Sequence, residues 1–396
     1  MKIVKVEDLH CDAGWRVNSF LKITTDEGIV GWAEYMEGYG AQGLTGVIHK
    51  LAERFLIGQD PRPVERISAF LYAATRQAPG GINQQAIAAI ENALVDIKAK
   101  ALGVPVYEML GGPVRDRLRL YWSHCGTYRV RYSERIKEWT GAEPIRSLDD
   151  FVQLGEEVAR RGFKALKTNV IRFDGPRPYI HSPGFNQAPG YPELNIDSHI
   201  VEAAVKQLEA LRRGAGPHIG LHLDTNFNYK TEGYIKLART LEPLDLTWLE
   251  IDTYDPAALA LIRRSARVSI ASCESLYSRR QYRPFFEQQS VDVAIIDVAW
   301  NGILESMKIA AMADAFEINV APHNFNGHLG SLISAHMCAA IPNFRIMEID
   351  IDDVLWKDDT VTVAPVIENG DLLLPTGPGW GADVDEAFVR AHPTNR

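Results

Sequence analysis

Six apolar runs in the second half of the chain each end on a residue that carries charge or exchanges protons. The runs IGLHLD, LTWLE, VSIASCE, VDVAIID, INVAPH and FRIME end at Asp224, Glu250, Glu274, Asp297, His323 and Glu348. The steps between these ends are 26, 24, 23, 26 and 25 residues. A buried strand has little reason to finish on a charge unless that charge has a partner. The near-constant spacing therefore predicts a repeated unit that presents these groups at equivalent positions.

The repeated unit is predicted to be a strand followed by a helix. We expect eight strands, near 118–124, 165–170, 219–224, 246–250, 268–273, 291–297, 317–322 and 344–349. The intervening helices carry start signals. These are a capping box of Ser147 with Asp150, an acidic N-cap at Asp197, and an N-cap at Asp255 before Pro256. Units of about 25 residues favour an α/β fold with a parallel (β/α)8-type TIM barrel. An open doubly wound sheet is the alternative, although no glycine-rich phosphate loop follows any strand.

In such a barrel the carboxyl ends of all strands face one shared space, where active sites lie. Asp224, Glu250 and Glu274, on three successive strands, would place three carboxylates together. Three bare carboxylates repel one another, so the arrangement predicts a cation among them. All-oxygen ligands favour Mg²⁺, which leaves positions for water or substrate oxygens. The alternative is that each acid is a helix cap or a solvated strand end. Three acids in regular succession make this the weaker interpretation.

The remaining strand ends predict proton transfer and substrate binding. A carboxylate beside an imidazole fixes its tautomer and makes it a better base, so Asp297 and His323 form a candidate catalytic pair. Lys167 and Asn169 lie two residues apart on the second strand and face the same way. A lysine there could hold an acidic substrate and offset developing negative charge. Asn226 adds a side chain that hydrogen-bonds but exchanges no proton.

The chain is predicted to have three parts. Residues 1–115 form an α+β capping domain, 116–365 the barrel, and 366–396 a tail that packs back on the cap. The cap begins with a hairpin, SFLKITTDEGIVGWAEY, and continues into a helix, QAIAAIENALVDIKAKALG, with Gly103 at its C-cap.

Composition restricts the partners. The formal net charge is −9 and no lysine or arginine run occurs, so nucleic acid and anionic membranes are poor candidates. The N-terminal segment lacks the pattern of a signal peptide. No apolar run approaches the length of about 18 residues that a membrane-spanning helix needs. The four cysteines are far apart, which predicts reduced thiols in a cytoplasmic protein and gives no zinc motif.

These residues resemble the enolase superfamily, and within it the mandelate racemase subgroup, nearly end to end. The segments TTDEGIVGWAE, ALVDIKAKALGVPVYEMLGGPVRDRLRLY and LPTGPGWGADVDE are similar to the family's first hairpin, cap-to-barrel junction and C-terminal return. The resemblance implies that Asp224, Glu250 and Glu274 correspond to the family's metal ligands. It also implies that Asp297 and His323 correspond to the acid–base pair, and Glu348 to the acid that binds the substrate carboxylate. The family's shared step removes the proton α to a carboxylate and gives an enolate.

Departures from the family pattern suggest the reaction. Mandelate racemase has K-x-K on the second strand, whereas this chain has Lys167 and Asn169, which disfavours racemisation. Galactonate dehydratases share K-x-N but have histidine where Asn226 stands. One base beside a metal suggests elimination, so we expect a Mg²⁺-dependent dehydratase that converts an aldonate or aldarate to a 2-keto-3-deoxy acid. A racemase or epimerase with Lys167 as second base, and a noncatalytic sugar-acid-binding barrel, are the alternatives.

Three further features are expected to set specificity. The insert 171–197 contains five prolines and three glycines and is interpreted as a lid over the mouth, with a tolerated surface loop as the alternative. Trp15 and Arg16 in the cap, and His124 at the end of the first strand, are candidate substrate contacts. The family forms dimers to octamers, so a homo-oligomer is expected.

Overall fold

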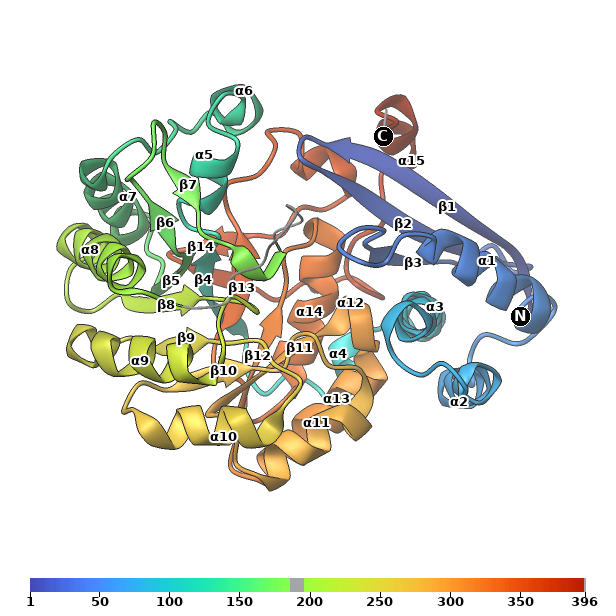
Figure 1. The fold of residues 1–396 in the computed structure, drawn as a ribbon. Coiled ribbons are helices and arrows are strands. Elements are labelled where there is room, and N and C mark those ends of the chain that lie inside the picture. The colour runs from blue at the N-terminus through green and yellow to red at the C-terminus, as the bar shows by residue number, and fades with distance from the viewer. Residues whose placement is uncertain (186–195, 395–396) are drawn as a thin grey trace.

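The computed structural model describes residues 1–185 and 196–394, which fold into a barrel and a cap beside it (Figure 1). All eight predicted barrel strands are present. They are β4 (Arg117–Ser123), β5 (Ala165–Asn169), β8 (Gly220–Asp224), β9 (Trp248–Glu250), β10 (Ile270–Ser272), β11 (Val293–Asp297), β12 (Asn319–His323) and β13 (Met347–Asp350). From β4 to β12 each strand pairs in parallel with the next, and β13 pairs in parallel with β4. The ring closes at Val320, which bridges Phe344 just before β13.

The longer helices of the barrel units lie around the ring of strands (Figure 1). They are α7 (Leu148–Arg160), α8 (Ser198–Ala215), α9 (Thr231–Leu241), α10 (Pro256–Ser265), α11 (Ser278–Glu287), α13 (Ile303–Asp314) and α14 (His328–Ala340). Two predicted helix start signals are confirmed. Ser147 and Asp150 form a capping box, and the side chain of Asp255, the N-cap before Pro256, accepts hydrogen bonds from two backbone amides. Asp197 is the N-cap of α8, but its side chain makes no cap hydrogen bond there.

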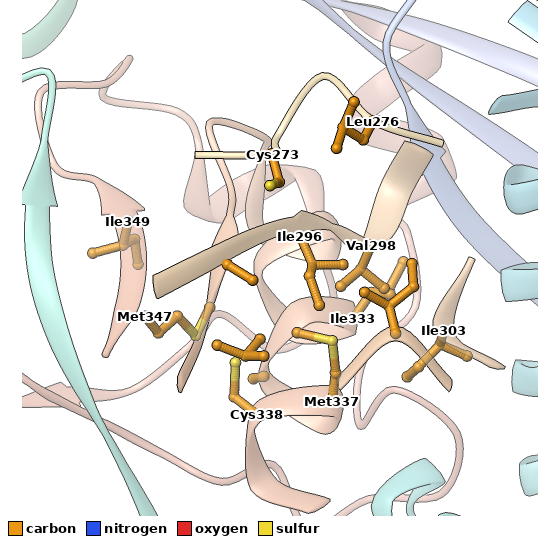
Figure 2. Close-up of a cluster of buried hydrophobic side chains, with 14 of the residues drawn as sticks. Cys273, Leu276, Ile296, Val298, Ile303, Ile333, Met337, Cys338, Met347 and Ile349 are labelled. Atoms are coloured by element: carbon orange, nitrogen blue, oxygen red, sulfur yellow. The ribbon is translucent and has the colours of Figure 1, made fainter. Parts of the chain in front are cut away.

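The barrel wall buries apolar side chains between strands and helices. Figure 2 shows one such cluster, in which Ile296 of β11 and Met347 of β13 face Met337 of α14. All four cysteines are buried and free, as the sequence predicts for reduced thiols. Every residue of α14 is buried, and the helix packs against β12, β13 and β4.

The cap is an antiparallel three-stranded sheet followed by helices. It comprises β1 (Ile3–Ala13), β2 (Arg16–Thr25), β3 (Val30–Tyr35), α1 (Leu44–Phe55), α2 (Val64–Thr75), α3 (Gly81–Leu102) and α4 (Val106–Met109). The predicted hairpin turns at Gly28, whose φ of 82° suits glycine, and Gly103 is the left-handed C-cap of α3. The sequence pattern anticipates an apolar stripe on α3, but most of that helix is buried because it lies between the cap sheet and the barrel.

The eighth strand–helix unit has no α-helix in the part of the chain that the structure describes before the tail. After β13 the chain passes through η3 (Asp358–Thr360) and then β14 (Ile367–Glu368) and β15 (Asp371–Leu373), which pairs with β4. This segment holds the cap instead: the Trp356 indole N–H donates to the Asp12 carbonyl at 2.9 Å.

The tail then runs along the cap. The Trp380 indole donates to the Trp32 carbonyl at 2.8 Å, and α15 (Glu386–Ala391) lies against β1. The domain bounds expected from the sequence remain predictions.

The insert after β5 begins with a two-stranded hairpin, β6 (Ile171–Arg172) and β7 (Tyr179–Ile180), and a turn, η1 (Pro183–Phe185). The rest of the predicted lid, 186–195, lies outside the described residues, so the lid remains a prediction. Among the described helices, none is long and apolar enough to span a bilayer.

Candidate active site

Strand register aligns the candidate residues in rows at the carboxyl ends of the strands, the mouth of the barrel. Asn169 pairs with Asp224 between β5 and β8, and Asp224 pairs with Glu250 between β8 and β9. On the other side of the ring Asp297 pairs with His323 between β11 and β12. Residues far apart in sequence are therefore neighbours because each ends a strand of the same parallel ring.

Glu274 reaches the mouth by a different route. It lies two residues beyond β10, and the intervening Cys273 has φ of 93°, a conformation that residues other than glycine rarely adopt. The turn at Cys273 keeps Glu274 buried, with its Oε2 3.7 Å from Nε2 of His323. A strained residue beside a buried acid is typical of a functional site.

Lys167 lies among three carboxylate side chains and is ion-paired with each of them. Its Nζ lies 3.1 Å from Glu250 Oε1, 3.7 Å from Asp224 Oδ2 and 2.8 Å from Glu348 Oε1. The lysine is 2% exposed, so these ion pairs are shielded from water. The second oxygen of Glu250 accepts from the indole of Trp248 at 2.9 Å, which fixes the carboxylate's orientation.

His323 and Asp297 form the predicted pair. Nδ1 of His323 lies 2.7 Å from Oδ2 of Asp297, whose other oxygen accepts from the Trp300 amide at 2.9 Å. Asp297 thus holds the ring with Nε2 toward the mouth. Burial alone would lower the pKa of His323, but Glu274 and Asp297 outweigh it and raise the pKa to about 10.

Glu348 is held on several sides. Its Oε2 accepts from the Asn324 amide at 2.7 Å, and the Ser123 hydroxyl and the Lys167 ammonium contact Oε1. Burial opposes ionisation, yet Lys167 and His323 lower the pKa of Glu348 to about 2. The carboxylate therefore stays charged at the wall between β12 and β4.

The donor set fits a hard divalent cation. Burial, with mutual repulsion among the acids, raises the pKa of Asp224, Glu250 and Glu274 despite Lys167. Additional positive charge among their oxygens would relieve that repulsion. Among the described residues, no group of three or more His, Cys, Asp or Glu side chains stands in metal-holding geometry, because Asp224 and Glu250 turn their oxygens to Lys167.

The three expected substrate contacts differ in what they touch. Asn169 is committed to the protein: its Oδ1 accepts from the Thr127 hydroxyl at 2.9 Å and its Nδ2 donates to the Asp224 carbonyl at 3.2 Å. Asn226 donates its backbone N–H to Asp224 Oδ1 at 3.0 Å and is partly exposed. His124, one residue past β4, binds Asp350 and keeps a partly exposed ring. Their role in binding substrate remains a prediction.

Arg16 reaches the mouth from the cap, as the sequence suggests, but it binds protein. Its guanidinium lies 3.1 Å from Asp350 Oδ2 and also contacts Asp353 and the Phe325 carbonyl. Trp15 stacks on Tyr132 with ring centroids 5.4 Å apart. These residues join cap to barrel.

Sequence reasoning missed two buried acids of the mouth. Asp252 lies two residues after Glu250, and its pKa is raised well above its usual value by burial and by the neighbouring acids Glu274 and Asp224. Asp350 lies two residues after Glu348 and is 3% exposed. The same two-residue spacing that relates Lys167 to Asn169 would have found Asp350, which lies on β13 with Glu348, because alternate strand residues share a face. Asp252 lies beyond the end of β9, where strand alternation gives no signal.

Comparisons with known proteins agree with this architecture. A model of the mandelate racemase/muconate lactonizing enzyme N-terminal domain matches residues 16–111, and a model of the enolase C-terminal domain-like family matches residues 150–388. The D-xylonate dehydratase of Haloferax volcanii is 30% identical over 380 residues, covering 94% of this chain and 84% of the relative. The D-galactonate dehydratase of Ralstonia nicotianae is 30% identical over 405 residues, covering 98% and 94%.

Solved structures show the same fold. A Burkholderia xenovorans protein, provisionally designated an L-alanine-DL-glutamate epimerase, is 49% identical with a TM-score of 0.95, covering 99% of this chain and 98% of its own. The same protein has been crystallised with magnesium and fumarate. A dehydratase of Mesorhizobium loti, also a provisional designation, is 30% identical with a TM-score of 0.85, covering 100% and 99%.

Proposed function

Since the chain belongs to the mandelate racemase and muconate lactonizing enzyme group of the enolase superfamily, we propose that it is a Mg²⁺-dependent sugar-acid dehydratase. The substrate would be an aldonate or aldarate and the product a 2-keto-3-deoxy acid. The observation that carries the proposal is the Asp297–His323 pair beside the buried acids Asp224, Glu250 and Glu274. Relatives named D-xylonate and D-galactonate dehydratase support this substrate class.

Asp224, Glu250 and Glu274 would hold the Mg²⁺ ion. When bound, Mg²⁺ supplies positive charge that stabilises the negative charge developing on an acid substrate as its α-proton leaves. Magnesium in the crystal of the Burkholderia relative supports this assignment. Lys167, a donor beside Asp224 and Glu250, would orient the substrate carboxylate and share its charge.

His323 would remove the α-proton through Nε2, the ring nitrogen that Asp297 leaves free. A cation held by Glu274 would offset the carboxylate charge that raises the pKa of this ring, so that Nε2 could accept a proton. General acid–base catalysis contributes about 10²–10⁴-fold, or roughly 3–5 kcal/mol, which is less than a typical enzymatic acceleration requires. Charge stabilisation must supply the remainder. In the form expected from the sequence, protonated His323 then returns its proton to the departing β-hydroxyl.

A panel of aldonates and aldarates, including D-xylonate and D-galactonate, tests the proposal with Mg²⁺ present. A 2-keto product from at least one acid, with loss of water, is the expected result. The proposal would be wrong if the whole panel gave no such product.

Epimerisation is the second candidate, favoured by the designation of the Burkholderia relative. Lys167 would be the second base, because it lies across the mouth from His323. This candidate predicts that deuterium from D₂O enters unreacted substrate at the α-carbon, with inversion and without loss of water. The noncatalytic alternative is set aside because the chain is an enzyme by family. A homo-oligomer and a cytoplasmic location remain predictions.

A further inference from the structure

The mouth contains a second aspartate–histidine pair that the proposed reaction does not use. Nδ1 of His124 lies 2.8 Å from Oδ1 of Asp350, as Nδ1 of His323 lies 2.7 Å from Oδ2 of Asp297. In both pairs the carboxylate is buried, whereas the His124 side chain is 20% exposed. Two histidines are thus held in the same way at one mouth.

Asp350 is well fixed for this purpose. Its Oδ2 accepts from Arg16 and from the Tyr128 hydroxyl, both at 3.1 Å, which leaves Oδ1 for His124. His124 is also stacked on Tyr128 with ring centroids 4.5 Å apart. Because Nδ1 is engaged, Nε2 is the atom available for proton transfer, and it makes no hydrogen bond to any residue the structure describes.

The two histidines lie close in the ring. β12, β13 and β4 are consecutive, so Glu348 separates the strand ends that carry His323 and His124. The ring of Phe325 lies between them, with centroids 4.8 Å from His323 and 6.5 Å from His124. His124 has φ of 47°, the left-handed conformation that directs its side chain out of the strand line.

We propose that His124, oriented by Asp350, is a second catalytic residue that donates the proton to the departing β-hydroxyl after His323 has removed the α-proton. This inference rests on the proposed dehydration. The electron pair from the Cα–H bond first moves into the substrate carboxylate, which gives an enolate, and then forms the Cα–Cβ double bond as the Cβ–O bond breaks. The Nε2 proton of protonated His124 joins the leaving oxygen, which departs as water. The resulting enol becomes the 2-keto acid when it gains a proton at Cβ and loses the proton of its hydroxyl. His323 has then gained one proton and His124 has lost one, and exchange with solvent returns both to their starting states.

The variant His124→Asn separates acid catalysis from a structural role. Asparagine can still donate a hydrogen bond to Asp350 but has no proton to transfer. We expect dehydration of the accepted sugar acid to fall about 10²–10⁴-fold. In D₂O, deuterium should enter the α-carbon of unreacted acid, because His323 still removes that proton.

The decisive comparison uses the 3-deoxy-3-fluoro analogue of the same acid. Fluoride leaves without needing a proton, so His124→Asn should eliminate fluoride within about tenfold of wild type. His199→Asn, on an exposed side chain at the start of α8 away from the mouth, is the control and should retain the dehydration rate.

Equal losses on the hydroxyl and fluoro substrates would show that His124 is structural, and an unchanged dehydration rate would show that it is not used; either result overturns the proposal while leaving dehydration intact. If wild type itself dehydrates no acid of the panel, the proposed function and this role fail together.

Discussion

At the scale of single residues, the neighbours of His323 determine what it can do. Its Nδ1 is engaged by Asp297 at 2.7 Å, and its Nε2 lies 3.7 Å from Glu274. Nε2 is therefore the ring nitrogen that faces the mouth, beside Glu274. A substitution that removes this basic nitrogen but keeps a side chain of similar size therefore tests the role of His323.

We expect His323→Asn to lower kcat about 10²–10⁴-fold, because the substitution removes the base while leaving the buried acids in place. α-Proton exchange in D₂O should disappear together with dehydration. Steady-state kinetics and NMR of the recovered substrate measure both effects.

The control is His199→Asn, a histidine at the start of α8 whose side chain is 59% exposed. It should leave both rates at their wild-type values. Retention of α-exchange by His323→Asn would show that another group is the base.

The places of the buried acids and of His323 at the mouth were predictable because each ends an apolar run of the sequence at regular spacing. Asp252 and Asp350 were missed, although each follows a predicted acid by two residues. The partners of Arg16 could not be foreseen. Its binding to Asp350 and Asp353 joins residues more than 330 positions apart, and it depends on how the cap is placed on the barrel.

At the scale of elements, α3 shows why a helix pattern alone is incomplete. Its apolar spacing predicts one buried face, yet Glu91 and Asn92 are buried too, because the opposite face meets the barrel. Asn92 Oδ1 accepts from the Ile303 amide and Glu91 Oε1 from the Leu304 amide, both at 2.9 Å. The two side chains thus satisfy the first amides of α13, which has no side-chain cap of its own.

Glu91 gives this contact a pH dependence. Burial raises its pKa from 4.5 to about 7, despite hydrogen bonds from Ser68 and Leu304. The folded protein therefore binds this proton more tightly than the unfolded chain. The stabilisation is fully present below about pH 4.5 and is lost as pH rises through about 7. The difference corresponds to about 3 kcal/mol.

We expect Glu91→Gln to remove this dependence, so that the variant gains stability relative to wild type between pH 5 and pH 8. Urea unfolding at both pH values measures the gain. Glu53→Gln, on an exposed side chain of α1, should follow wild type at both. Parallel pH profiles for wild type and Glu91→Gln would contradict the account.

At the scale of the whole molecule, the cap is joined to the barrel mouth by buried charges. Arg16 is 5% exposed and binds Asp350 and Asp353, and Lys357 lies 2.8 Å from Asp353. The predicted eighth helix gives way to the segment that makes these contacts. The sequence repeat predicted eight units, but it could not show that the last one serves the cap.

Arg16→Met should lower the free energy of unfolding by about 3–5 kcal/mol, because it leaves buried carboxylates without their partner. Hydrogen exchange should accelerate in 350–357, and KM should rise as the mouth opens to water. Denaturant unfolding and mass spectrometry measure these changes.

Arg62→Met breaks an exposed ion pair with Asp60 and is the matched control, which should unfold at the same denaturant concentration as wild type. An Arg16→Met variant as stable as this control would mean that Arg16 does not join the two parts.

The central claim is that Asp224, Glu250 and Glu274 share one divalent cation beside His323. A crystal structure with Mn²⁺ in place of Mg²⁺ tests it most directly, because anomalous scattering locates the ion without assumptions about its ligands. We predict one strong peak within about 2.0–2.3 Å of an oxygen from each of the three acids, with Lys167 turned away from them. A peak elsewhere, or Asp224 and Glu250 still paired with Lys167 at saturating Mn²⁺, would contradict the account.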